Sequence, residues 1–282
     1  MRSELEQHTR LLHAALTQLE VTEPGGLLAW QEHRMVDLRA LRMRCDSLER
    51  LVPDELEPGY TTGEETLQLH LERYEFASRY ARQGRLLDIA CGVGYGTRLL
   101  TDRSRAEISA IGVDISAEAT CYARERYEND HTHFITCDAM QFQDPEGFDT
   151  IVSLETIEHV PDPAGFIDHM IELLRPGGIF VGSVPTTPSV DANPHHLHDF
   201  TERSFRRLSE HHDLIEVDAL RQIQVFKLGA ALTRSEPRME QIRRNLLAYY
   251  LYHPGAFARR IWSTLRHGFT NHYITIIWRA GA

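Results

Sequence analysis

Long apolar stretches and paired cysteines are missing from this 282-residue sequence. No run of 18 or more apolar residues occurs, so we expect no membrane-spanning helix. The first ten residues are polar, which predicts a chain without a secretory signal. Only four cysteines occur, none of them in a C-x-x-C pair: Cys45, Cys91, Cys121 and Cys137. This spacing argues against a zinc knuckle or a disulfide framework, and we expect reduced thiols in a cytoplasmic protein.

The composition is that of an ordinary globular protein. Hydrophobic residues make up 42% of the chain and charged residues 25%, which excludes a wholly disordered or collagen-like chain. A chain of this length accommodates one large domain with an appendage, or two small domains.

Charge is distributed unevenly along the chain. The net charge is −11, yet residues 221–282 hold ten Lys and Arg against two Glu and carry +8, which leaves −19 on residues 1–220. The acidic bulk argues against nucleic-acid binding. The basic C-terminal region suits an anionic substrate or peripheral contact with a membrane surface, or it is a solvated face that balances the acidic body.

Residues 1–55 carry a helical pattern. Apolar side chains recur at alternating spacings of three and four, as in Leu12, Ala15 and Leu19 and again in Leu38, Leu41 and Cys45. This spacing places one apolar seam on a helix and predicts an N-terminal helical arm of coiled-coil type. The arm either packs on its own domain or makes the protein a homo-oligomer.

Short apolar runs alternate with helical stretches over the rest of the chain. Strands are predicted at 85–90, 108–113, 133–137, 148–154, 178–183 and 273–278, and helices at 97–102, 117–127, 163–174, 239–251 and 256–266. This alternation predicts an α/β fold with a doubly wound, mostly parallel sheet. We expect a domain over residues 56–282, in which 226–270 form a basic helical insertion before the last strand.

A glycine-rich loop follows the first predicted strand. The sequence LLDIACGVGYG (86–96) places Asp88 before glycines at 92, 94 and 96, and a helix is predicted to follow. Asp114 and Asp138 end the next two predicted strands, and an acid at the position of Asp114 suits a ribose diol. A dinucleotide site would favour a third glycine where Thr97 stands, at the opening of the helix that receives the pyrophosphate.

This order of motifs resembles the class I S-adenosylmethionine-dependent methyltransferases over about residues 84–225. The resemblance implies a Rossmann-like methyltransferase fold with S-adenosylmethionine as the cofactor. It implies that Asp88 and the backbone from Ala90 to Gly94 hold the methionine part, and that Asp114 takes the ribose hydroxyls. Ile115 would line the adenine slot and Asp138 would reach the adenine amino group. The residues expected to bind the cofactor are Asp88, Ala90, Gly92, Gly94, Asp114, Ile115, Asp138, Ala139 and Glu155.

Two histidine-bearing segments are expected on the acceptor side. One is ETIEH (155–159), where Glu158 and His159 would share a side if Glu155 began a helix. The other is NPHHLHD (193–199), in which His196 matches an Asn-Pro-aromatic-His pattern of glycan-modifying members, although His195 replaces the aromatic residue. His159 and His196 are therefore the candidate catalytic residues, and the sequence does not rank His196 firmly against His195 and His198.

Three types of chemistry are compatible with these segments. Glu155, Glu158, His159 and His196 could hold a divalent ion such as Mg or Mn, as E-x-x-E-H does in the small-RNA 2′-O-methyltransferases and quinone-ring O-methyltransferases that it resembles. Such an ion would anchor vicinal oxygens and lower the pKa of a hydroxyl. Alternatively, a histidine acts as the base without a metal, or proximity alone aligns the acceptor with the activated methyl group.

The resemblance favours an oxygen acceptor, and we expect a small-molecule or glycan acceptor with a sugar hydroxyl in a glycan or polysaccharide pathway. A small phenolic or quinone-like acceptor is the alternative within enzymes. A non-catalytic, cofactor-binding scaffold is the alternative outside them. The sequence decides neither which hydroxyl is methylated nor how many chains assemble.

Overall fold

The computed structural model divides the chain into two units, Met1–Arg44 and Cys45–Ala282. The predicted arm over residues 1–55 lies outside the described residues except at its end, where a short 3-10 helix η2 spans Pro53–Glu55. The arm and its role in oligomerisation therefore stay predictions. The structure describes residues 50–56, 61–210, 212–225, 242–243 and 245–281.

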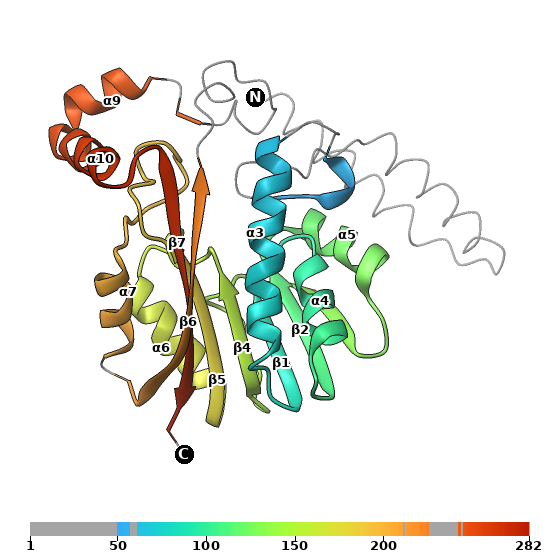
Figure 1. Ribbon diagram of the computed structural model, residues 1–282. Helices are drawn as coiled ribbons and strands as arrows, with labels where there is room; N and C mark the ends of the chain where they lie inside the picture. Colours follow the sequence, from blue (N-terminus) through green and yellow to red (C-terminus); the bar gives the residue numbers. More distant parts are fainter. Residues whose placement is uncertain (1–49, 57–60, 211, 226–241, 244, 282) are drawn as a thin grey trace. The chain divides into compact units, whose positions relative to one another are not determined.

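A mixed sheet forms the centre of the described part of the second unit, with seven strands in the order β3-β2-β1-β4-β5-β7-β6 (Figure 1). The first five strands of this order are parallel, and β7 is antiparallel to both of its neighbours. This arrangement confirms the predicted α/β, mostly parallel sheet. The strands are β1 Gly84–Ile89, β2 Ile108–Asp114, β3 Thr132–Thr136, β4 Phe148–Leu154, β5 Leu174–Pro185, β6 Leu214–Val225 and β7 Thr270–Ala280.

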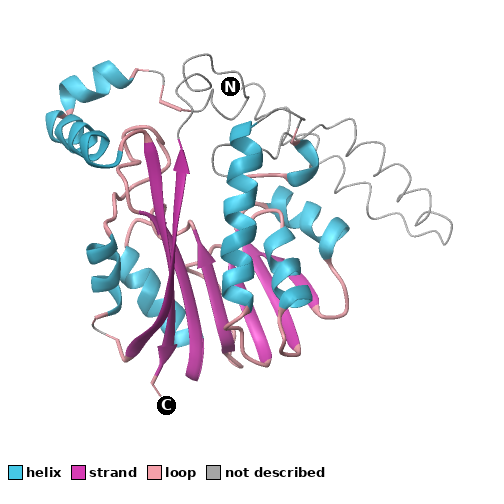
Figure 2. Ribbon diagram, viewed as in Figure 1, coloured by secondary structure: helices cyan, strands magenta, loops and turns pink. Residues whose placement is uncertain are grey.

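Helices cover both faces of the sheet (Figures 1 and 2), as parallel sheets require. One core joins Leu86 to α3 and α4, and the other joins Leu87 to α6 and α7, because successive side chains of a strand point to opposite faces. The helices are α3 Thr61–Ser78, α4 Tyr95–Arg103, α5 Ala117–Tyr127, α6 Pro163–Leu173, α7 Glu202–Ser209, α9 Leu246–Tyr252 and α10 Pro254–His267.

Two elements of the C-terminal half were not predicted. Strand β6 was not predicted because it has no continuous apolar run. It lies at the edge of the sheet and carries polar and half-exposed residues. Helix α7 is only eight residues long and has a single buried residue, Phe205, so its apolar side chains are too few to predict a helix. The strand predicted at 178–183 is longer in the structure, because β5 continues to Pro185. Among the described residues, no helix is long and apolar enough to cross a membrane.

The region expected to be a basic helical insertion, 226–270, contains α9 and α10. The helix predicted over 239–251 is described only from Leu246 onward, where α9 begins; residues 226–241 and 244 lie outside the described part. The second predicted helix, 256–266, corresponds to α10.

Candidate functional site

The predicted acidic residues share one edge of the sheet. In the parallel register Asp88 of β1 pairs with Gly112 of β2 and with Val152 of β4, and Asp114 of β2 pairs with Thr136 of β3. The carboxyl ends of these strands therefore lie side by side, where open α/β sheets bind their ligands.

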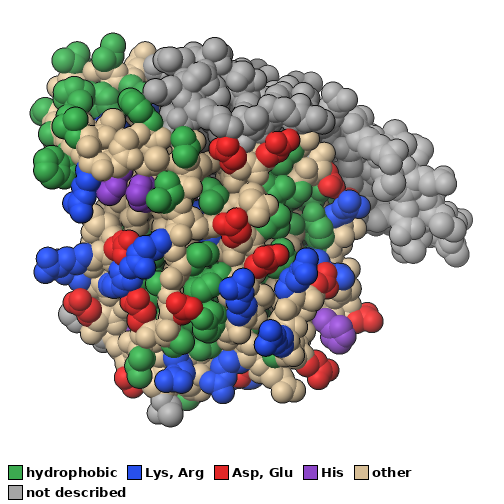
Figure 3. Space-filling view, viewed as in Figure 1, with side chains coloured by type: hydrophobic (Ala, Val, Ile, Leu, Met, Phe, Trp, Pro, Cys, Tyr) green, Lys and Arg blue, Asp and Glu red, His purple; other side chains and the backbone are tan. Residues whose placement is uncertain are grey.

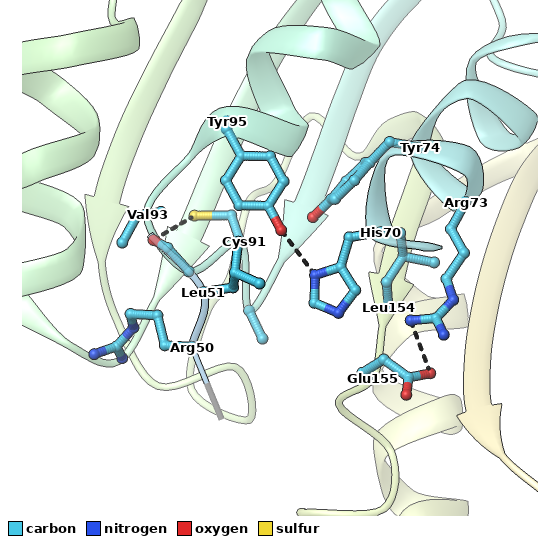
Figure 4. Close-up of a pocket in the computed structure, with 12 residues that line it drawn as sticks. Arg50, Leu51, His70, Arg73, Tyr74, Cys91, Val93, Tyr95, Leu154 and Glu155 are labelled. Atoms are coloured by element: carbon cyan, nitrogen blue, oxygen red, sulfur yellow. Dashed lines mark hydrogen bonds and ion pairs between the residues drawn. The ribbon is translucent and has the colours of Figure 1, made fainter. Parts of the chain in front are cut away.

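A pocket opens at this edge (Figure 4). Helix α3 contributes three of its side chains, and the loop after β1 contributes four consecutive residues. Figure 4 shows His70 pointing toward Tyr95, and the ring nitrogen Nδ1 lies 2.7 Å from the tyrosine oxygen. The lining residues are Arg50, Leu51, His70, Arg73, Tyr74, Ala90, Cys91, Gly92, Val93, Tyr95, Leu154 and Glu155.

The three glycines of the loop have different roles. Gly92 has a φ of 58°, and a Cβ placed on it would meet no atom within 4 Å, so its backbone borders open space. Gly94 has a φ of 86°, but a Cβ there would lie 2.6 Å from both Ala123 and the Phe134 ring. Gly96 faces the Tyr74 ring at 1.9 Å in the same construction. Gly92 therefore leaves room for a ligand, whereas Gly94 and Gly96 permit close packing.

Asp88 has a buried carboxyl group near the carboxyl end of β1. Its Oδ2 accepts hydrogen bonds from the Thr97 hydroxyl at 2.6 Å and the Tyr74 hydroxyl at 3.4 Å, while its Oδ1 has no partner among the described residues. Burial raises the pKa of Asp88 to about 7, against the lowering effect of these hydrogen bonds. The unpartnered oxygen suits a donor supplied by a ligand, such as the ammonium group of S-adenosylmethionine.

Asp114 ends β2 with both carboxylate oxygens engaged by the backbone. Its Oδ2 accepts from the Gly92 amide and its Oδ1 from the Ser116 amide, each at 2.9 Å. The Arg50 guanidinium lies 3.6 Å from Oδ1. Each oxygen keeps acceptor capacity for one more donor, which fits the two hydroxyls of a ribose. Next to it, the side chain of Ile115 is 71% exposed, so it offers an apolar surface at the rim.

Asp138 and Ala139 follow β3 in a turn. The Oδ1 of Asp138 accepts a hydrogen bond from the Met140 amide at 2.9 Å, and Ala139 packs against the larger core. Both residues are half-buried. This position beside the ends of β2 and β3 is compatible with the predicted adenine contacts, which stay a prediction.

Glu155 follows β4 and lines the pocket beside α3. Its φ of 51° is unusual for a residue with a side chain, and its amide donates to the Ser183 hydroxyl at 2.9 Å. The Ser183 hydroxyl donates in turn to Glu155 Oε1 at 2.8 Å. The same oxygen lies 3.6 Å from the guanidinium of Arg73, which is only 1% exposed (Figure 4). Glu155 is thus fixed toward Ser183 and Arg73.

Glu155 does not begin a helix, so the condition under which Glu158 and His159 would share a helix side is not met. The left-handed backbone at Glu155 is incompatible with a helix, residues 157–159 form a turn, and α6 begins only at Pro163. Glu158 and His159 nevertheless meet His196: one ligand-type atom from each of the three lies within 4.8 Å of the others. Glu155, the fourth predicted metal ligand, is not in this group.

Glu158 is the unusual member of this group. Its carboxylate is fully buried, and neither oxygen has a hydrogen-bond partner among the described residues. Burial, with Glu155 as a neighbouring acid, raises the pKa of Glu158 well above its usual value, although His159 opposes the shift. An unsatisfied buried carboxyl is costly, so a cation or a donor at this place would relieve a real energetic penalty.

The structure separates the three histidines of the loop between β5 and α7. The ring of His196 stands edge-on to that of His159 with centroids 4.6 Å apart, and its Nδ1 lies 2.7 Å from the Ser189 hydroxyl. His195 contributes a backbone carbonyl 3.2 Å from His159 Nδ1. The ring of His198 instead bonds to the Val160 carbonyl at 3.0 Å. Only His196 brings its ring to His159.

Sequence reasoning missed several residues of the pocket. Arg73, Tyr74 and His70 lie on α3 at helical spacing, so they face the same side, but α3 precedes the glycine-rich loop and carries no motif that marks them. Ser183, which orients Glu155, lies inside a buried strand and carries no local signal. Arg50 belongs to the predicted arm, yet it lines the pocket.

The chain is similar in sequence to known methyltransferases. A family model described as a methyltransferase domain matches residues 42–224. A probable S-adenosylmethionine-dependent methyltransferase of Mycolicibacterium smegmatis is 27% identical over 168 residues, which are 57% of this chain and 62% of that protein. A ubiquinone biosynthesis O-methyltransferase of a Bradyrhizobium species is 35% identical over 101 residues, 35% of this chain and 39% of that protein. The chain thus spans less than two thirds of these relatives.

A solved structure shares the fold. The N-methyltransferase NodS of Bradyrhizobium japonicum, in complex with S-adenosyl-L-homocysteine, aligns with a TM-score of 0.52 and 17% identity, over 86% of this chain and 98% of that one. This likeness confirms the predicted fold class. The family match over more than half of the chain supports S-adenosylmethionine, the predicted cofactor. The chain belongs to the methyltransferase domain family, within the class I S-adenosylmethionine-dependent methyltransferases.

Proposed function

We propose that the protein transfers the methyl group of S-adenosylmethionine to a hydroxyl oxygen held beside Glu158, His159 and His196. The observation that supports this proposal is the fully buried Glu158 carboxylate, which has no hydrogen-bond partner within the described residues and is adjoined by two imidazoles. A buried acid with adjacent histidines provides groups that orient a hydroxyl and receive its proton. The fold alone does not decide the acceptor atom, since NodS is named an N-methyltransferase.

In this proposal, different residues bind the cofactor and the acceptor. The Gly92 backbone and Asp88 bind the methionine part, and Asp114 binds the ribose. Glu155 lines the same pocket three residues before Glu158, so the acceptor-side cluster adjoins the cofactor side. The sulfonium supplies the activated methyl group, and the protein has to align the hydroxyl and accept one proton. His159 is the proposed base, and it is more exposed than Glu158.

The cluster also fits a divalent ion. Glu158, His159 and His196 would hold it. The Glu158 carboxylate supports this assignment, because it has no hydrogen-bond partner among the described residues. A donor set of one carboxylate and two imidazoles favours Mn²⁺ over Mg²⁺, which prefers oxygen ligands alone. When bound, such an ion lowers the pKa of a coordinated hydroxyl. Glu155 is excluded from this proposed set because it is fixed toward Ser183 and Arg73.

Two acceptor classes were expected, a sugar hydroxyl and a phenolic or quinone-like hydroxyl. Relatives named ubiquinone biosynthesis O-methyltransferases match the chain at 30 to 37% identity, which supports the phenolic class. The sugar hydroxyl, in a glycan or polysaccharide, stays a prediction that no observation tests. Both classes can present vicinal oxygens, so the same cluster suits either.

The test is a methyl-transfer assay with the full chain, in which formation of S-adenosylhomocysteine is followed with a catechol or with a hexopyranoside as acceptor. We expect turnover with the catechol, and a loss of at least about 100-fold in kcat for His159→Asn, the size expected for a general base. His131→Asn, at an exposed surface position, is the matched control and should keep full activity.

Two outcomes contradict parts of the proposal. Binding of S-adenosylmethionine in calorimetry without turnover on any hydroxyl acceptor would support a non-catalytic scaffold. Full activity after chelation, with no bound divalent ion by elemental analysis, would eliminate the metal and leave His159 as the base. Retained activity in His159→Asn would eliminate the base instead.

A further inference from the structure

Helices α9 and α10 expose an unusual amount of apolar surface. Leu247 and Leu251, one turn apart on α9, are each 83% exposed, and α9 has no buried residue. Figure 3 shows hydrophobic side chains gathered over this part of the molecule. We call the following set the α9–α10 apolar face: Leu247, Leu251, Tyr252, Phe257, Ile261, Trp262, Leu265 and Phe269, all exposed.

The face on α10 is one continuous stripe. At 100° per residue, Phe257, Ile261, Leu265 and Trp262 fall within an arc of about 140°. Trp262 is 66% exposed and Leu265 78%. Amphipathic helices of a globular protein normally turn such a stripe toward the core, whereas here the stripe faces away from it. Large exposed apolar patches mark interaction sites.

The opposite side of α10 is attached to the domain. Ala256 is buried, and the Arg260 guanidinium donates to the carboxylate of Asp191, with its Nε 2.8 Å from Oδ2. The Tyr250 hydroxyl of α9 donates to the same carboxylate at 2.6 Å. Asp191 is itself buried and belongs to the loop that carries His196. These contacts fix which side of α10 faces the domain, so the apolar stripe is held outward.

The charged side chains of the C-terminal stretch that carries this face are all basic. Residues 241–282 contain no Asp and no Glu, in a chain whose net charge is −11. Arg259 and Arg266, seven residues apart, share one side of α10 and border the apolar stripe beside Trp262. The Arg259 side chain is 61% exposed, with its nearest acid, Asp199, at 3.8 Å.

We propose that the α9–α10 apolar face docks on an anionic lipid bilayer. Helices that lie in the bilayer interface combine an apolar face of Trp, Phe and Leu with a bordering row of basic residues, and α10 has this pattern. Each basic residue near an anionic leaflet adds to binding, which matches Arg259 and Arg266 and the absence of acidic residues from the sequence 241–282. The docking does not depend on the identity of the methyl acceptor.

A second copy of the chain is the less favourable occupant. A two-fold contact uses the same surface of both protomers, so it would bring two copies of Arg259 and Arg266 into one interface. No acidic residue within 241–282 could compensate that charge. An anionic bilayer covers the same apolar area and supplies the opposite charge.

The test is co-sedimentation of the full chain with vesicles of phosphatidylcholine and phosphatidylglycerol, or of phosphatidylcholine alone. We expect binding to the mixed vesicles, at least tenfold weaker binding to phosphatidylcholine alone, and a loss of at least tenfold in the double variant W262E/L265E. The control I215E/V217E adds the same charge at exposed apolar positions of β6. Ile215 pairs with Arg279 near the end of β7, whereas α10 precedes Thr270 at the start of that strand. The control positions are therefore remote from α10, and this variant should bind like the wild type.

A second measurement does not depend on the acidic variants folding correctly. Of the three tryptophans, Trp278 is buried in the core and Trp262 is exposed. Mixed vesicles should shift tryptophan emission to the blue in the wild type, and Trp262→Phe should lose this shift while still binding. Absence of wild-type binding, equal binding by W262E/L265E, or a vesicle-insensitive dimer that W262E/L265E converts to a monomer would each overturn the proposal.

Discussion

The buried guanidinium of Arg73 lies 3.6 Å from the carboxylate of Glu155 and so joins α3 to the turn after β4. Its Nε also donates to Gln222 of β6 at 2.7 Å, and its guanidinium stacks over the Tyr273 ring at 4.5 Å. One side chain therefore ties a helix, an edge strand and the pocket wall together. Because Arg73 is almost fully buried, its charge depends on these partners for stabilisation.

Arg73→Leu should lower the free energy of unfolding by about 3 to 5 kcal/mol, because it leaves Glu155 and Gln222 without their buried partner. Urea unfolding measures this loss. Adding Glu155→Gln should recover part of it, since the uncompensated charge is then removed. Arg98→Ala is the control: Arg98 pairs with Asp102 at an exposed position, and its removal should cost less than about 1 kcal/mol. Equal losses for both variants would refute the buried network.

Asp88 should make the cofactor-free protein less stable as pH rises. Its pKa is raised from 3.8 to about 7, so the unfolded chain binds fewer protons than the folded one between these values. The free energy of unfolding therefore falls across this window and its contribution levels off above about pH 7. Relative to the wild type, Asp88→Asn should gain about 1.4 kcal/mol per pH unit between about pH 5 and 7. Thermal or urea unfolding at several pH values gives this slope.

Asp144→Asn provides a control of opposite sign for the same experiment. Arg85 hydrogen bonds lower the pKa of Asp144, so its contribution to stability is present at neutral pH and is lost as the pH falls through its folded value. The deficit of Asp144→Asn should shrink toward low pH. A pH-independent difference between Asp88→Asn and the wild type would mean that Asp88 is not buried as described.

The parallel half of the fold was predictable because β1, β4 and β5 are buried over most of their length and read as apolar runs. Asp88, Asp114 and Asp138 could be placed at one edge of the sheet because the carboxyl ends of parallel strands lie side by side. Strand β6 and helix α7 could not be predicted. The edge strand carries many polar positions, and the helix is only eight residues long with one buried residue, so neither contains a long apolar pattern.

The acceptor side was only partly predictable. The grouping of Glu158 and His159 with His196 was expected, but from a helix at Glu155 that does not exist. The group forms through tertiary contacts instead, because the Glu158 carbonyl accepts hydrogen bonds from the amides of Leu197 and His198 in the distant loop. Contacts across 40 residues of sequence leave no local pattern, so neither these bonds nor the separation of Glu155 could be predicted.

Asp114→Asn should weaken binding of S-adenosylmethionine by more than about tenfold, or roughly 1.4 kcal/mol. Asparagine retains one oxygen for the Gly92 or Ser116 amide, but it cannot accept both ribose hydroxyls as well. Titration calorimetry measures the affinity. Glu118→Gln, in the first turn of α5, is an exposed control that should bind normally. An unchanged affinity in Asp114→Asn would show that the ribose lies elsewhere.

Gly96 and Gly255 should respond in opposite ways to substitution by alanine. Both lie in helices, where Ala normally stabilises by about 1 kcal/mol relative to Gly. A Cβ at Gly96, however, would overlap the Tyr74 ring at 1.9 Å, so Gly96→Ala must displace that ring from Asp88, and we expect a loss of about 1 to 3 kcal/mol. A Cβ at Gly255 would meet only the Arg259 side chain, at 3.7 Å, so Gly255→Ala should gain up to about 1 kcal/mol. Urea unfolding separates the two, and a stabilised Gly96→Ala would show that α3 does not pack against α4 through Tyr74.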